Sequence, residues 1–401
     1  MSKELYKLKH LEKTDLAEFR KKHKDKKIVF TYGTYDLIHS GHAIYLLKAR
    51  ASGDILVVGV ATNESKKRVK TKRLPLIDEI NREEQIQYFD FVDNTVLVDV
   101  DNLTKELSLL KPDVFFTLEN DWITNIRTSA EQTIANDLGI KVIKTQKDEI
   151  YVSASDMINR VADVRIKSKV EYFFGKTKID LSKGDWSKKK WSSLKTDIRD
   201  DTLYFGKHIH KAKGCCEEYI ARIVDYDEVD RIRDIYQLGN KKIVLAMGTC
   251  DLLHAGHTRF FQKAKDQGDI LVLGIPTDRI VRRYKGAGRP VITEYSRAEL
   301  MSFFRFTDFV VIYDEKDVKP FIEKLKPDIF FTINEDWNEA ATDLSYFTDI
   351  KDWKGKVVGV EPQSKNLSSN KLIRKATGLR LEQLFGEELN EASKTKPLKD
   401  W

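Results

Sequence analysis

The stretch that decides the fold occurs twice, as GTYDLIHSGH at residues 33–42 and as GTCDLLHAGH at residues 248–257. Each follows a short apolar run, at 27–32 and 242–247, and each leads into a helical pattern that ends at a Gly-Asp pair. A strand, a tight turn and then a helix start would place the free N–H groups and partial positive charge of that helix beside the histidines. Four of the eight histidines of the chain lie in these two stretches. The pattern predicts a phosphate site at the end of each strand.

These stretches belong to a longer internal repeat. At an offset of 215 positions the similarity continues without a gap over about 140 positions; Pro75 corresponds to Pro290, and the Lys-Pro-Asp sequence at 111–113 to that at 326–328. Matches so far apart in the chain indicate two similar domains in tandem. We expect a first copy at 1–165, an inserted linker subdomain at 166–225, a second copy at 226–378, and a C-terminal helix and tail at 379–401.

Apolar runs and helical patterns alternate within each copy. In the first copy we expect strands at 27–32, 55–61, 91–98, 114–118 and 141–144, and helices at 41–50, 78–89, 103–110 and 130–138. The second copy repeats the strands at 242–247, 270–275, 309–313, 328–332 and 356–360. This alternation predicts the α/β class, with two tandem Rossmann-like parallel-sheet domains. Ligands of such sheets bind beyond the carboxyl ends of the strands, where both histidine stretches lie.

Composition indicates a folded protein that binds a small anion. Hydrophobic residues make up 41% of 401 residues, and 70 basic against 63 acidic residues give a net charge of +7. This excess fits a polyanionic small molecule and gives little support for nucleic acid. The insert is rich in aromatic residues, so we expect a small α+β unit that packs against a domain or a second subunit, which allows for a homodimer.

Cysteine content and the N-terminus predict a soluble, cytoplasmic protein. The chain has three cysteines, two of them adjacent, which fits a reducing compartment. It shows neither an apolar leader nor a run of about 20 apolar residues. We therefore expect no contact with a membrane.

The two histidines of each stretch lie three residues apart, so their side chains share one face at a helix start. There they can donate hydrogen bonds to phosphate oxygens, and Gly33 or Gly248 lets the backbone approach the same phosphate. The alternatives are a capping histidine or a metal pair, but no third His or Cys ligand recurs in the repeat. His208, His210, Cys215 and Cys216 in the insert have residue types that suit zinc, at a spacing that matches no common pattern.

Both copies resemble the nucleotidyltransferases of the cytidylyltransferase superfamily, whose mark is His-x-Gly-His. The resemblance covers residues 25–165 and 240–378. The sequence KGAGRP at 285–290 is similar to the heptose-1-phosphate adenylyltransferase domain, whereas Asp-Trp at 336–337 is similar to glycerol-3-phosphate cytidylyltransferase. The tandem layout resembles ethanolamine-phosphate cytidylyltransferase. Class I aminoacyl-tRNA synthetases share a related histidine motif, but their Lys-Met-Ser-Lys-Ser sequence is missing here.

The resemblance implies an enzyme that transfers CMP or AMP from CTP or ATP to a phosphorylated alcohol or sugar, with Mg²⁺ carried by the nucleotide and no metal ligands from the protein. The implied catalytic residues are His39, His42, Lys70, His254, His257 and Lys285. The implied nucleotide-binding residues are Gly33, Thr34, Asp36, Asp121, Trp122, Ser153, Ser155, Gly248, Thr249, Asp251, Asp336, Trp337, Ser368 and Ser369. The implied substrate-phosphate residues are Arg82, Arg289, Arg297 and Arg305.

The copies differ where the family binds phosphate. Arg305 corresponds to Asp90, whose carboxylate would repel a phosphate, and Arg289 corresponds to Leu74. The second copy therefore matches the family more completely. Both copies lack the family arginine that precedes the last helix, with Lys147 and Lys365 as the nearest basic residues.

Four hypotheses about function follow from these features. The main hypothesis is cytidylyl transfer, favoured over adenylyl transfer only by the two Asp-Trp pairs. The alternatives are an ADP-forming sugar-1-phosphate adenylyltransferase and a protein that binds a nucleotide for regulation with one or both copies inactive. Nucleic-acid binding through the lysine-rich insert is the weakest hypothesis.

Overall fold

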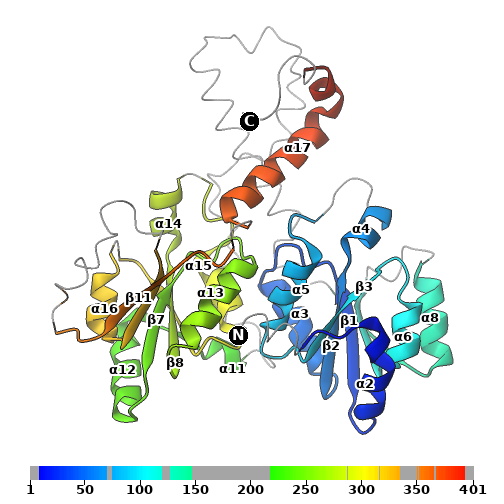
Figure 1. The fold of residues 1–401 in the computed structure, drawn as a ribbon, viewed down its shortest axis with the longest axis horizontal. Coiled ribbons are helices and arrows are strands. Elements are labelled where there is room, and N and C mark those ends of the chain that lie inside the picture. The colour runs from blue at the N-terminus through cyan, green and yellow to red at the C-terminus, as the bar shows by residue number, and fades with distance from the viewer. Residues whose placement is uncertain are drawn as a thin grey trace.

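The computed structural model describes residues 9–69, 75–119, 127–146, 217–286, 288–315, 317–334, 350, 352–364 and 367–392. Each copy of the repeat forms one parallel sheet with helices packed on it (Figure 1). The expected α/β class with two tandem Rossmann-like domains is confirmed. Among the described residues, no helix is both long and apolar enough to cross a membrane.

The first sheet has the strand order β3-β2-β1-β4-β5. Its strands are β1 (Ile28–Gly33), β2 (Ile55–Ala61), β3 (Asn94–Val98), β4 (Val114–Leu118) and β5 (Lys141–Thr145). Its helices are α2 (Leu16–Lys22), α3 (Ser40–Arg50), α4 (Asn63–Val69), α5 (Glu79–Gln87), α6 (Thr104–Leu110) and α8 (Arg127–Asp137). The central strands are apolar and buried on both faces, as a parallel sheet covered by helices requires.

The second sheet repeats this order and adds a strand at one edge, giving β11-β10-β7-β8-β9-β6. Its strands are β6 (Ile223–Val224), β7 (Ile243–Met247), β8 (Ile270–Pro276), β9 (Phe309–Tyr313), β10 (Ile329–Ile333) and β11 (Lys356–Val360). Its helices are α11 (Glu217–Ile220), α12 (Val229–Leu238), α13 (Ala255–Lys265), α14 (Asp278–Lys285), α15 (Glu294–Ser302), α16 (Lys319–Leu325) and α17 (Ser369–Ala392). The extra strand β6 comes from the segment expected to be an insert, and it pairs with β9.

Strand order explains where a ligand can bind. The chain moves outward from β7 to β8 and β9, then returns to place β10 on the other side of β7. Crossover connections therefore diverge at the carboxyl end of β7, which leaves a crevice there. The histidine stretch 248–257 starts at that end, and the stretch 33–42 occupies the same place after β1.

The two copies meet along an apolar seam. Phe89 and Phe304, which occupy equivalent positions, pair across the seam as an antiparallel bridge, and their rings stack 4.8 Å apart. The Asp90 N–H donates to the Phe303 carbonyl oxygen at 3.1 Å, and the Arg305 N–H donates to that of Tyr88 at 3.0 Å. Buried residues of both copies therefore form one hydrophobic cluster. Helix α13 packs against α5, and α15 against α3, on the two sides of this seam (Figure 1).

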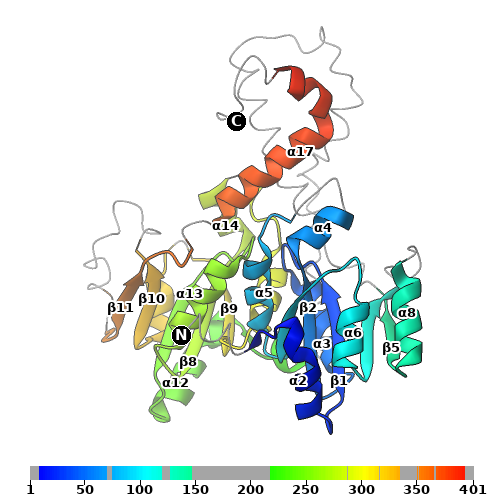
Figure 2. The ribbon, with the colours of Figure 1, turned by 45° about the vertical axis from the view of Figure 1, so that its right-hand side comes forward.

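Helix α17 connects the second copy to the first. It continues without a break across the boundary expected at 378/379, and in two views it rises from the second copy (Figures 1 and 2). Its apolar residues pack with Leu37 and Leu76 of the first copy as well as with residues of the second. The Lys375 Nζ donates to the carbonyl oxygens of Pro75 at 3.1 Å and Leu76 at 2.8 Å.

Shortening Phe304 to alanine should destabilise both copies together. Because the ring is fully buried in the shared cluster, Phe304→Ala is expected to lower the free energy of unfolding by about 3–5 kcal/mol. Urea unfolding followed by tryptophan fluorescence measures it. The control Ile235→Ala, at a side chain that is 64% exposed, should change stability by less than about 0.5 kcal/mol. A loss below about 1 kcal/mol for Phe304→Ala would contradict a shared core.

Candidate nucleotide-binding site

A cleft of about 1710 Å³ opens at the carboxyl end of β7. Its walls come from the turn after β7, the start of α13, the end of α14, the segment after β9, the end of β10 and the segment that leads from β11 into α17. A single small-molecule site usually occupies about 300–1,000 Å³, so this cleft has room for more than one substrate. Of the predicted residues, it is lined by Gly248, Thr249, Asp251, His254, His257, Lys285, Arg289, Ser368 and Ser369.

The two histidines of the second copy lie against each other at the start of α13, with their ring planes tilted by 38°. Their ring centroids are 3.9 Å apart, and the backbone N–H of His254 donates a hydrogen bond to Nδ1 of the His257 ring at 3.3 Å. Nδ1 of His254 is buried and has no hydrogen-bond partner among the described residues. Burial, with a smaller contribution from the charge of Arg259, lowers the pKa of His254 to about 4. His39 and His42 of the first copy have the same centroid separation of 3.9 Å.

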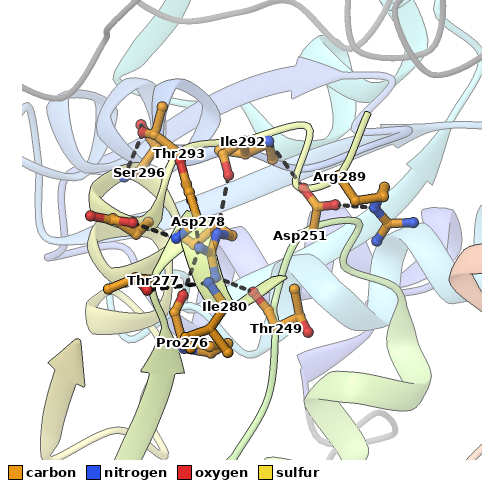
Figure 3. Close-up of polar contacts among 12 residues, drawn as sticks. Thr249, Asp251, Pro276, Thr277, Asp278, Ile280, Arg289, Ile292, Thr293 and Ser296 are labelled. Carbon is orange, nitrogen blue, oxygen red and sulfur yellow. Dashed lines mark hydrogen bonds and ion pairs between the residues drawn. The ribbon is translucent and has the colours of Figure 1, made fainter. Parts of the chain in front are cut away.

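Cationic side chains surround His257. Burial lowers its pKa, and the nearby charges of Lys285 and Arg289 lower it further. The Arg289 Nε donates to Asp251 at 2.5 Å, whereas its Nη2 is buried without a partner among the described residues (Figure 3). A buried cation of this kind favours an anionic ligand, because the ligand supplies the missing acceptor.

Asp251 holds a loop in place. Its Oδ1 accepts hydrogen bonds from the backbone N–H groups of Val291 at 2.7 Å and Ile292 at 3.0 Å. Its Oδ2 accepts one from Nε of Arg289; the contacts with Ile292 and Arg289 are drawn in Figure 3. These bonds occupy both oxygens, so Asp251 orients the loop and is poorly suited to bind a metal. Asp36 does the same in the first copy, since it accepts the N–H groups of residues 76 and 77.

Arg297 and Arg82 do not lie in the cleft, contrary to their predicted contact with substrate phosphate. Arg297 is fully buried, and its guanidinium donates to the carbonyl oxygens of Ile292, Thr249 and Pro276 and to Asp278. The acceptors converge from the turn after β7, the end of β8 and the loop before α15 (Figure 3). Arg82 makes the equivalent bonds in the first copy. These arginines hold together the segments behind the site, because each guanidinium makes four hydrogen bonds to protein oxygens.

Arg305 lies in the seam, so its predicted contact with substrate phosphate is also wrong. Its Nη2 donates to the carbonyl oxygens of Phe89 at 2.8 Å and Val92 at 3.4 Å in the first copy, and burial lowers its pKa to about 10. Asp90 forms an ion pair with Arg222 at 2.9 Å, also at the seam. The exchange of Arg305 for Asp90 at equivalent positions therefore changes the contacts between the two copies and does not change the lining of the cleft.

The start of α17 supplies backbone donors to the cleft. Ser368 caps this helix, since its Oγ accepts the N–H of Lys371 at 3.2 Å, and both residues line the cleft. A helix start of this kind favours phosphate. Further polar lining residues were not predicted from the sequence, among them Tyr284, Glu315, Asp317, Gln363, Ser364 and Lys371. Of these residues, only Lys371 could have been recognised from the sequence, because it lies three residues after the predicted site residue Ser368.

The turns of the two copies have the same backbone but different side chains. Tyr35 and Cys250 occupy equivalent positions with φ of 51° and 52°. Tyr35 lies against Gly33, whereas in the second copy Phe261 and the smaller Cys250 lie against Gly248, and Leu46 replaces Phe261 in the first copy. The exchange of a large and a small residue keeps each turn filled. Burial raises the pKa of Cys250 to about 12, so this thiol stays protonated.

Several predicted residues lie outside the described residues. These are Lys70, Asp121, Trp122, Ser153, Ser155, Asp336 and Trp337, together with the His-Cys cluster at 208–216. Within the described ranges, no group of three or more His, Cys, Asp or Glu residues is arranged to hold a metal ion.

The fold, the repeat and the paired histidines agree with a family comparison. The model of the cytidylyltransferase-like family matches residues 30–168 and again residues 245–377, which together are more than half of the chain. The chain belongs to the cytidylyltransferase-like family. This membership confirms the resemblance that the two His-x-Gly-His sequences indicated.

Individual proteins with similar sequences match only part of this chain. The chain is 44% identical over 112 residues to the bifunctional protein HldE of Campylobacter curvus (28% of this chain, 24% of that protein), and 45% identical over 107 residues to that of Geobacter metallireducens (27% and 22%). It therefore spans about a quarter of the length of these relatives. A lipopolysaccharide core biosynthesis protein from Thermoplasma volcanium is 27% identical, with a TM-score of 0.27 over 31% of this chain and 99% of that one.

Arg297→Gln should destabilise the protein. Removing the guanidinium leaves four acceptors without their donor, two of them in fully buried hydrogen bonds, and we expect a loss of about 3–5 kcal/mol in the free energy of unfolding. Thermal and urea unfolding measure this loss. The exposed Arg231→Gln is a control with a small expected effect. Wild-type stability of Arg297→Gln would contradict the bracing role.

His254 should make stability depend on pH. The folded ring has a pKa of about 4 and the unfolded ring one near 6.5, so only the unfolded chain binds this proton between those values. The stabilisation is present above pH 6.5 and is lost as the pH falls towards 4, by about 2 kcal/mol at pH 5. Urea unfolding at pH 7 and pH 5 should show this decrease for wild type and a smaller one for His254→Asn. Equal decreases would contradict the prediction.

Proposed function

We propose that the second copy is a nucleotidyltransferase site, in which a phosphorylated acceptor attacks a nucleoside triphosphate and pyrophosphate leaves. The observation that carries the proposal is the cleft itself, where His254, His257, Lys285, Arg289 and the start of α17 converge beyond β7. Imidazoles, cations and helix N–H groups all favour phosphate, and here they share one cavity.

The proposed reaction is a direct displacement. An oxygen of the acceptor phosphate forms a bond to the α-phosphorus, while the bond from that phosphorus to the bridging oxygen breaks and its electron pair leaves on pyrophosphate. No side chain needs to form a covalent intermediate, so catalysis consists of positioning and charge stabilisation. When bound, Mg²⁺ on the nucleotide would neutralise part of the phosphate charge.

The residues of the cleft divide this work. His254 is neutral near pH 7 because of its lowered pKa, and an approaching triphosphate would favour its protonated, charged form. The buried Nη2 of Arg289 offers a donor without a competing partner among the described residues. Glu315, Asp317 and Glu361 also line the cleft, but no three such side chains in the described part of the chain are arranged to hold a metal ion, so Mg²⁺ would arrive with the nucleotide.

The comparisons favour a different nucleotide from the one that we expected. The similarity to HldE proteins, together with the sequence KGAGRP at 285–290, supports adenylyl transfer to a sugar 1-phosphate over cytidylyl transfer. The test incubates the protein with Mg²⁺, ATP or CTP, and a hexose 1-phosphate, a heptose 1-phosphate, glycerol 3-phosphate or phosphoethanolamine. Pyrophosphate released only with ATP and a sugar phosphate would support the proposal. Its absence from every pair would overturn it.

A second candidate is nucleotide binding without turnover. It is favoured by the missing family arginine before Ser368 and by Leu74 in the first copy at the position of Arg289. Calorimetry that detects nucleotide binding, without pyrophosphate in any acceptor assay, would select this candidate.

His257→Ala should reduce kcat/KM much more than His42→Ala. The second copy carries Arg289 and the described cleft, so we expect a loss of about 10²–10³-fold for His257→Ala and less than about threefold for His42→Ala. Initial rates of pyrophosphate release measure both. Equal losses would contradict the assignment of catalysis to the second copy.

A further inference from the structure

One ion pair crosses the seam close to the proposed site. Arg259 lies on α13 two residues after His257, and its Nε donates to Oε1 of Glu84 on α5 at 2.7 Å. Nη2 of Arg259 donates to the other oxygen of Glu84 and, at 3.1 Å, to Oδ1 of Asn81. The Glu84 side chain is 7% exposed, so the contact is largely screened from water. A bidentate pair of this type fixes both the position and the plane of the guanidinium.

The same guanidinium also reaches the wall of the cleft. Nη1 of Arg259 donates to the Gln363 carbonyl oxygen at 3.4 Å. Residues 361–364 line the cleft and lead to the start of α17. This wall lies directly on α13, since a Cβ at Gly256 would come within 2.9 Å of the Ser364 Cβ. A shift of Arg259 would therefore move the wall beside His254.

Electrostatics agree with this geometry. The hydrogen bond to Glu84 raises the pKa of Arg259, so its guanidinium is charged at any ordinary pH. That charge adds to the effect of burial in lowering the pKa of His254. Arg259 is thus close enough to influence the histidine pair, while its own hydrogen bonds go to Glu84, Asn81 and Gln363.

Only one of the two copies receives support from the other through this type of ion pair. In the repeat, Arg259 corresponds to Ile44 and Glu84 corresponds to Glu299. Ile44 has no charge and cannot form an ion pair, so the first copy receives no equivalent support from the second. The stacked rings of Phe89 and Phe304, by contrast, come from equivalent positions of the two copies.

We propose that the first copy is a structural part of the second copy's site, in which Glu84 fixes Arg259 and Arg259 holds the wall at Gln363 where the nucleotide binds. Both are positioning residues for the nucleotide. This inference rests on the proposed function of the cleft, and it gives the first copy a role that requires no turnover of its own.

The test is a double-mutant cycle on nucleotide affinity. Calorimetry gives Kd for ATP and for CTP with the wild type, Glu84→Gln, Arg259→Gln and the double variant of the full chain. We expect each single variant to raise Kd about tenfold and the double variant to raise it about tenfold as well, because all three remove the same link. In the pyrophosphate assay KM for the nucleotide should rise similarly, with kcat within about threefold of wild type.

Glu299→Gln is the matched control, at the equivalent position of the other copy, and should keep Kd within twofold. Thermal unfolding midpoints of all variants show whether a change in Kd comes from a loss of stability. If Glu84→Gln does not fold, Arg259→Gln still tests the link, because the Arg259 side chain is less buried than that of Glu84. Unchanged Kd in both single variants, or a loss of about a hundredfold in the double variant, would overturn the inference. A wild type that binds neither nucleotide would overturn the proposed function and this inference with it.

Discussion

The stack of Phe89 on Phe304 is the contact on which the arrangement of the two copies depends. Two equivalent rings meet where the copies meet, so each copy covers apolar surface that the other would otherwise expose. The result is a cluster of buried residues shared by both copies, in addition to a separate core cluster within each copy. Because α13 runs along this seam, the helix that carries His254 and His257 is positioned by both copies.

Buried charged side chains fix the positions of the backbone segments that form the site. The Arg297 guanidinium ties together the turn after β7, the end of β8 and the start of the helix that follows, and Asp251 ties the turn to the loop at 289–292. A charge buried this deeply is tolerated only when its hydrogen bonds are made, so each one fixes the backbone that satisfies it. Arg289 differs, since one of its nitrogens is buried without such a partner in the described part of the chain.

The two copies keep the same supports and differ in what they present to a ligand. Arg82 and Arg297 make equivalent bonds, as do Asp36 and Asp251. At the position of Arg289 the first copy has leucine instead. Duplication followed by divergence can thus leave a copy that keeps its fold and its contact surface while the other carries an additional cation, Arg289.

The sequence by itself determined the repeat, the alternation of strands and helices, and the family, because these depend on local periodicity and on one short pattern. Strands β2, β4, β9 and β11 begin and end where the apolar runs do. Only the tertiary structure decided what each arginine does. An arginine that faces a phosphate and one that faces carbonyl oxygens look the same in a sequence, and so Arg297 and Arg305 were misassigned while Arg259 was not noticed. Apart from Ile292, five positions before Arg297, their partners lie 19 to 216 positions away in the chain, and no local pattern encodes such contacts.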